Sequence, residues 1–231
     1  MGRKGLKKAD IWLSVGPNCR AVAWLRDTGL TRLAAPSDWL LIHDADTLLK
    51  LYKSRFSGVL EEIEEYQPAG EREHRFVRDV RHDVLFMHHF ETGKPLEEER
   101  VRVREQVLRR AQKTHTALLC SRAIGLVSNW EVDREELCKL LKGFARMYPC
   151  RKITLYNLRH DPEQEGCWET ETVLSPRLTL VEYLFDDTAQ TGNPKGWRGN
   201  RERWVQILGQ FSLSIWGRLC RKLAFWRHRE G

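Results

Sequence analysis

A cysteine stands where an apolar segment gives way to an amphipathic one. Residues 11–15 read as a short strand, a Gly-Pro-Asn turn follows, and Cys19 opens a helical pattern that runs to Thr28 and ends at Gly29. The first amides of a helix have no partners within it, and the helix dipole is positive there. Such a position can lower the pKa of a cysteine from about 8.5 to roughly 3.5–7.5. We therefore expect Cys19 to be a nucleophile that reacts as a thiolate.

A cysteine nucleophile needs a base within about 2.6–3.2 Å of its sulfur, and a third group that orients this base. His88 and His89 end a predicted strand, residues 80–90. Only one of the two can face the cysteine, because neighbouring side chains on a strand point to opposite faces. The third group is open between Asp38 and Asn157. The competing interpretation is that the cysteine is a small buried residue without a chemical role.

Five short motifs follow one another along most of the chain. They are S-V-G-P-N-C at 14–19, L-R-D-T-G-L-T-R at 25–32, A-P-S-D-W-L at 35–40, H-H-F at 88–90, and W-R-G-N at 197–200 followed by Trp204. Together they resemble the motifs of a bacterial family of papain-like cysteine peptidases, whose members are largely of unknown function. Two positions depart from the family: Ser37 replaces a phenylalanine, and His89 replaces an acidic residue.

The resemblance implies a papain-like fold in which Cys19 attacks an acyl carbon and His88 serves first as base and then as acid. His89 is the alternative base, and Asp38, in the family's D-W element, is a candidate for the third group. The implied substrate is a peptide, an amide or another acyl compound whose identity the sequence leaves open. No cofactor and no metal are implied.

Two further residues belong to the site by the same resemblance. Backbone amides around Cys19 would form an oxyanion hole with help from Asn18, and Trp39 would lie against the substrate.

Strands and helices interleave along the chain, which indicates a single α+β (mixed α/β) domain. The expected organisation is a basic extension at 1–10, a papain-like domain at 11–210 and a basic amphipathic helix at 211–231. Within the domain we expect helices at 97–116, 134–147 and 201–208, a helix that begins at Asp44 or Asp46, and strands at 117–120, 152–158 and 179–185.

Composition bounds the class of protein. The chain has 231 residues, 41% of them hydrophobic, which is enough for a real core. Six cysteines without a C-x-x-C pair favour a reducing cytoplasm over a disulfide scaffold. The net charge of +7 comes from the two ends, so residues 11–210 are formally neutral. With no basic stripe in this part, we expect no nucleic acid partner.

The tail at 211–231 carries tryptophan and leucine at three- and four-residue steps, among five arginines and lysines. A basic amphipathic helix of this kind can lie on an anionic membrane. We weigh peripheral contact with the inner membrane surface against packing on the domain and against a partner protein. The sequence does not choose among them.

Three other interpretations compete with cysteine catalysis. Asp44 and Asp46 form a D-x-D pattern that could hold a divalent cation in a glycan-related transferase, although a helix start explains them better. Histidines 43, 82, 88 and 89 could form a metal cluster, but nothing in the sequence shows that their side chains converge on one point. The third alternative is a papain-like module that only binds or assembles, for instance in surface polysaccharide production.

Overall fold

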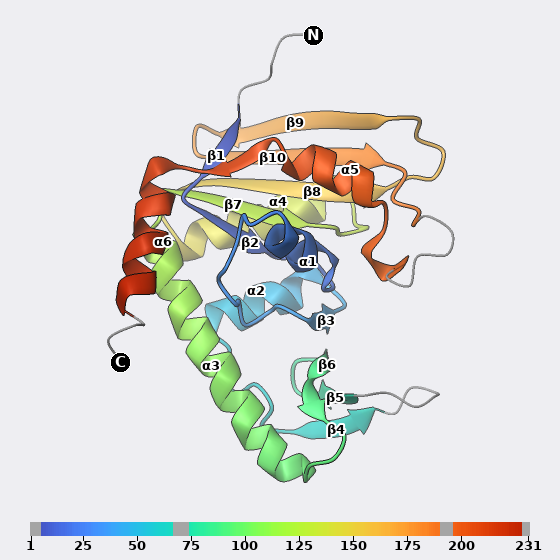
Figure 1. Ribbon diagram of the computed structural model, residues 1–231, viewed down its shortest axis with the longest axis vertical. Coiled ribbons are helices and arrows are strands. Elements are labelled where there is room, and N and C mark those ends of the chain that lie inside the picture. Colours follow the sequence, from blue (N-terminus) through green and yellow to red (C-terminus); the bar gives the residue numbers. More distant parts are fainter. Residues whose placement is uncertain (1–5, 67–73, 190–195, 228–231) are drawn as a thin grey trace.

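The computed structural model describes residues 6–66, 74–189 and 196–227. The protein is a mixed α+β structure built around a five-stranded sheet and a four-stranded sheet, with a long helix running along one flank (Figure 1).

The five-stranded sheet is parallel except at one edge. Its order is β2-β7-β8-β10-β9, with β2 (Ile11–Ser14), β7 (Ala123–Ser128), β8 (Lys152–His160), β10 (Leu178–Phe185) and β9 (Cys167–Ser175). The first four strands pair in parallel, and β9 is antiparallel to β10. The carboxyl ends of β2, β7, β8 and β10 therefore meet at one edge of the sheet, which is where parallel sheets commonly place their sites.

Alternating residues of these strands face two separate cores. Leu13, Leu126 and Leu155 belong to one core, together with α2 (Ala45–Lys53) and α4 (Arg134–Met147). The neighbouring positions Trp12, Val127 and Tyr156 belong to the other, together with α1 (Arg20–Asp27) and α5 (Arg201–Leu208). The two-residue period of a strand divides the apolar side chains in this way, and both faces of the sheet are covered, as parallel sheets require.

The four-stranded sheet is antiparallel, in the order β3-β6-β5-β4. Its strands are β3 (Leu40–Ile42), β6 (Val84–Glu91), β5 (His74–Asp79) and β4 (Ile63–Tyr66). α3 (Leu96–Cys120) packs on β6 near its amino end and then runs along the flank of the molecule toward α6 (Ile215–Arg227) (Figure 1). Its buried residues include Val103, Val107 and Ala111, which recur at helical spacing.

Several sequence expectations need correction. The strand expected at 80–90 begins only at Val84, because a turn that includes Asp83 at φ 52° precedes it. Residues 117–120 form the last turn of α3 instead of a strand. No breaker interrupts the helix there, and Leu118 continues its buried face. The helices at 134–147 and 201–208 are confirmed with those bounds.

A strand near the amino end of the described chain pairs with one near its carboxyl end. β1 (Lys7–Ala9) pairs in parallel with β11 (Phe211–Leu213), so the expected tail helix starts only at Ile215. Within the described ranges, no helix combines the length and the apolarity needed to cross a membrane.

Candidate active site

The turn that carries Cys19 lies at the carboxyl edge of the parallel sheet and is held by β7 and the loop after it. The Val15 amide donates to the Val127 carbonyl at 2.9 Å, and the Trp130 indole donates to the Val15 carbonyl at 2.7 Å. The turn approaches this loop closely at Gly16, where an added Cβ atom would lie 2.6 Å from Oδ1 of Asn129. Cys19 occupies the N-cap position of α1, with no capping hydrogen bond from its side chain.

Asn18 is part of the structure of this turn. Its Oδ1 accepts hydrogen bonds from the Arg20 amide at 3.0 Å and from Nδ2 of Asn129 at 3.3 Å. It therefore satisfies one of the open amides at the start of α1. Any contribution of Asn18 to an oxyanion hole would have to come from its amide nitrogen.

Cys19 is only 8% exposed, and this burial raises the pKa of its thiol. Its own backbone amide and the guanidinium groups of Arg20 and Arg198 act in the opposite direction but do not outweigh the loss of solvation. The expectation of a lowered pKa was therefore wrong. A helix amino end favours a thiolate, but here the sulfur lies under side chains that exclude water. In the resting protein Cys19 is a neutral thiol.

This raised pKa has a measurable consequence. The alkylation rate of Cys19 by iodoacetamide should rise about tenfold per pH unit from pH 6 to beyond pH 9, because only the thiolate reacts and its fraction grows at that rate below the pKa. Quenched-flow alkylation with mass spectrometry of the Cys19 peptide measures it. A plateau below pH 8 would contradict a raised pKa and indicate a preformed ion pair.

His88 and His89 lie in an irregular part of β6. Phe86 pairs with Val77 and Phe90 with Arg75, so three residues of β6 stand opposite one residue of β5. This bulge interrupts the alternation of side chains. His88 is exposed, whereas His89 is buried with its ring edge-on to Phe86. Of the two, His88 is the one that the strand presents to solvent.

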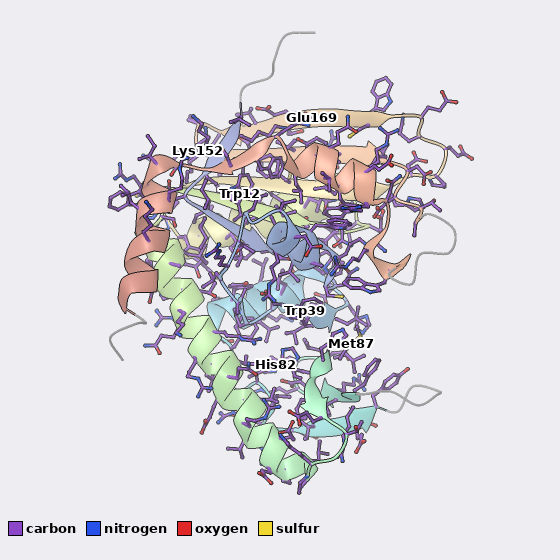
Figure 2. All side chains as sticks on the ribbon, viewed as in Figure 1. Trp12, Trp39, His82, Met87, Lys152 and Glu169 are labelled. Atoms are coloured by element: carbon purple, nitrogen blue, oxygen red, sulfur yellow. The ribbon has the colours of Figure 1, made fainter. Side chains whose placement is uncertain are left out.

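Trp39 connects this histidine to the region around Cys19. Its ring lies edge-on to His88 at 5.5 Å and to Trp197 at 6.3 Å. The Arg198 guanidinium, whose charge acts on Cys19, lies 5.1 Å from the Trp197 ring. In Figure 2, Trp39 lies between α1 and the antiparallel sheet, with Met87 of β6 beyond it. Trp39 has φ 67°, an unusual value for a bulky residue, and such strain is often found where a ligand is held.

Backbone hydrogen bonds also connect the turn of Cys19 with the strand of His88. The Ile42 amide of β3 donates to the Pro17 carbonyl at 2.8 Å, which attaches the cysteine turn to the antiparallel sheet. β3 in turn pairs with β6, with Leu40 opposite Phe86, two residues before His88. The strand that begins after Trp39 therefore bridges the turn of Cys19 and the strand of His88.

Asp38 is buried beside Trp39 and is occupied by structural partners. Its Oδ2 accepts from the Arg26 guanidinium at 2.8 Å and from the Ala35 amide at 3.0 Å. Burial raises its pKa to about 6, although Arg26 and the Ala35 amide oppose the shift. Ser37, which stands where the resembled family has phenylalanine, shares a 2.9 Å hydrogen bond with the Tyr52 hydroxyl. Asp38 thus fixes the loop before β3.

The burial of Asp38 should make stability depend on pH, and Arg26 should limit the effect. The folded state binds the Asp38 proton more tightly than the unfolded state, so the unfolding free energy decreases as pH rises from about 4 to 6. Arg26→Gln raises that pKa further. The variant should lower the free energy of unfolding by about 2 kcal/mol at pH 7.5 and by clearly less at pH 4.5. Urea unfolding at both pH values measures this, with exposed Arg32→Gln as control. An equal loss at both values would contradict the pairing.

Asn157, the other candidate for the third group, lies in the interior of the parallel sheet. Its Oδ1 accepts from the Ser128 hydroxyl at 2.6 Å and from the Trp130 amide at 2.9 Å, and its Nδ2 donates to the Trp130 carbonyl at 3.0 Å. It therefore shapes the end of β7, and acts on the cysteine turn only through Trp130.

Asp187 is a site residue that the sequence interpretation missed. It follows β10 and is buried, and its carboxylate accepts from Arg20 at 2.7 Å, from the Asn200 amide at 2.7 Å and from the Trp204 indole at 2.9 Å. It ties the W-R-G-N segment, part of which forms the short 3-10 helix η1 (Gly196–Arg198), to the start of α1. A carboxylate just after an apolar strand was the available signal.

A cavity of about 430 Å³ opens next to His88, between β6 and α3. Its walls combine two histidines, an aromatic ring, two guanidinium groups, a carboxylate and an amide, from the residues Trp39, His88, His89, Glu91, Arg102, Gln106 and Arg110. It is large enough for a small acyl group or a few side-chain-sized fragments.

The competing sites are not assembled. Asp44 caps α2 through the Thr47 amide and hydroxyl, both at 2.7 Å, and Asp46 pairs with Lys139 at 2.6 Å. The pair thus serves helix capping and an exposed ion pair. Among the residues that the structure describes, no three His, Cys, Asp or Glu side chains are grouped to hold a metal ion.

Comparison with protein-family models, with curated proteins and with solved structures finds no match for this chain.

Proposed function

We propose that this chain is a papain-like cysteine enzyme that hydrolyses or transfers acyl groups, with Cys19 as nucleophile and His88 as base. The observation that carries the proposal is the double link through β3: its backbone bonds the cysteine turn, and Trp39, the residue before it, contacts the His88 ring at 5.5 Å. This double link connects the segment of a cysteine at the start of a helix with that of an exposed histidine from a distant strand.

The reaction follows from the protonation state of the thiol. As the Cys19 sulfur bonds to the acyl carbon, its proton passes to a ring nitrogen of His88. The carbonyl oxygen becomes an oxyanion at the start of α1, where the Cys19 amide and the nearby Arg198 and Arg20 charges stabilise it. His88 then protonates the departing amine or alcohol. Water or another acceptor, deprotonated by His88, releases the acyl group and restores the thiol.

Site-resolved labelling tests the nucleophile. The native protein is treated with a chloroacetamide peptide, and each of the six free cysteines is followed by mass spectrometry. We expect Cys19 to react despite its burial, and Cys19→Ala to lose that adduct alone. Exposed Cys120 and Cys150 are internal controls. A Cys19 peptide that is labelled only after unfolding in urea would overturn the proposal.

The burial of Cys19 favours a second candidate, a papain-like module that binds or assembles without catalysis. A neutral, 8% exposed thiol is what a purely structural cysteine would show. Under this alternative, Cys19→Ala leaves every functional readout unchanged, and the exposed surface of His88 and Trp39 serves recognition.

We further propose that the protein is cytoplasmic and contacts the inner membrane surface through α6. Ile215, Trp216 and Leu219 are exposed on this helix, beside the basic residues Arg218 and Lys222. Trp216 is also held by the protein, with its indole donating to the Cys120 carbonyl at 3.2 Å. Cosedimentation with anionic vesicles, compared with neutral ones, tests this; equal recovery with both would contradict it. Residues 228–231 of the expected tail lie outside the described residues.

A further inference from the structure

One face of α3 carries three polar side chains into the cavity beside His88. Arg102, Gln106 and Arg110 follow each other at four-residue steps, which places them in a row on the same side of a helix. All three line the cavity, opposite β6. The row presents guanidinium and amide donors along one wall.

The first guanidinium of this row is already occupied. Arg102 donates to both carboxylate oxygens of buried Glu99, at 2.7 and 2.6 Å, and to the His89 carbonyl at 2.7 Å. These bonds fix the amino end of α3 to β6. Arg102 therefore shapes the cavity, and three of its five N–H groups are used by these bonds.

Arg110, at the other end of the row, differs. Its side chain is half-buried, and within the described chain its Nη1 is buried without a hydrogen-bond partner. Burial and the neighbouring Arg26 charge lower its pKa, and Asp38 compensates in part. A buried guanidinium donor without a partner is costly, and a bound anion would relieve that cost.

We propose that Arg110 binds a carboxylate group of the substrate, so that the acyl compounds processed at Cys19 carry a second, negatively charged end. This inference rests on the proposed function. The substrate would pass His88 and lie against the Trp39 ring, which lines the same cavity. A single negative charge suits the site better than a phosphate dianion, because Glu91 and Asp38 already place carboxylates nearby.

Matched reagents test the inference. 6-Maleimidocaproic acid and its neutral amide differ only in charge and react with the same thiol. We expect Cys19 to react about tenfold faster with the acid, and Arg110→Gln to abolish the preference. Arg110→Lys, which keeps the charge, should retain part of it. Arg109→Gln, one position away and exposed, is the matched control and should behave as wild type. Equal rates with both reagents, or a preference that survives Arg110→Gln, overturn the inference.

A second measurement separates this inference from the catalytic proposal. Hippurate and its amide are titrated calorimetrically into Cys19→Ala, which has no nucleophile. Hippurate binding that disappears with Arg110→Gln supports the anion site even if Cys19 proves unreactive. If Cys19 reacts but neither the acid preference nor Arg110-dependent hippurate binding is found, the catalytic proposal stands and the anion site falls. If Cys19 is unreactive and hippurate binding does not depend on Arg110, both fall.

Discussion

His88→Gln is expected to slow the acylation of Cys19 about 100-fold at pH 7, because a neutral thiol needs a base to take its proton as the bond to carbon forms. Burial holds Cys19 in its protonated form, so the dependence on a base should be strong. Glutamine is close in size to histidine and can hydrogen-bond but cannot accept that proton. The rate of thioester formation with an activated ester, followed by mass spectrometry, measures the effect.

Two other histidines provide controls for this variant. His43→Gln changes an exposed histidine that does not line the cavity beside His88, and it should leave the rate unaltered. His89→Gln tests the alternative base. Because His89 is buried against Phe86, this change should reduce stability while affecting the rate much less than His88→Gln. A larger loss of rate with His89→Gln would reverse the assignment of the base.

Gly199→Ala is expected to destabilise the protein by about 3 kcal/mol or more, through backbone strain and steric overlap together. Gly199 has φ 71°, and a Cβ there would lie 2.1 Å from Oδ1 of Asp187. That carboxylate cannot retreat without losing its bonds to Arg20 and the Trp204 indole. Because Arg20 follows Cys19, the alkylation rate of Cys19 should change as well.

Gly196→Ala is the matched control for this substitution. It lies three residues earlier in the same segment, and among the residues that the structure describes its added Cβ would meet only Ala189, at 3.8 Å. Urea unfolding of both variants gives the comparison. Similar stabilities for the two would show that the Asp187 cluster does not hold the segment against α1.

Local elements could be predicted from the sequence because their signals are local. The Asp44 cap of α2 and the apolar periodicity of α4 lie within a few residues of the elements they define. The sheets could not be predicted in this way. The pairing of β2 with β7 joins residues more than a hundred positions apart, and no short pattern encodes it. β9 was missed because none of its residues is buried and its sequence does not alternate between apolar and polar side chains.

The candidate site, like the fold, could be predicted from the sequence only in part. The sequence identified Cys19, His88 and Trp39, and the structure brings their segments together through β3. The sequence left open whether the thiol would be buried, because that depends on side chains from distant segments. Asp187 and Arg110 were missed for the same reason. The charged neighbour of Asp187 is Arg20, that of Arg110 is Asp38, and both neighbours lie far away in the chain.

Rapid mixing with p-nitrophenyl acetate tests whether Cys19 accepts and transfers acyl groups. We expect a stoichiometric burst of p-nitrophenolate, with the acetyl group found on Cys19, a slower burst in His88→Gln and none in Cys19→Ala. A burst that persists in Cys19→Ala, or acetyl groups found only on other residues, would contradict acyl transfer at Cys19.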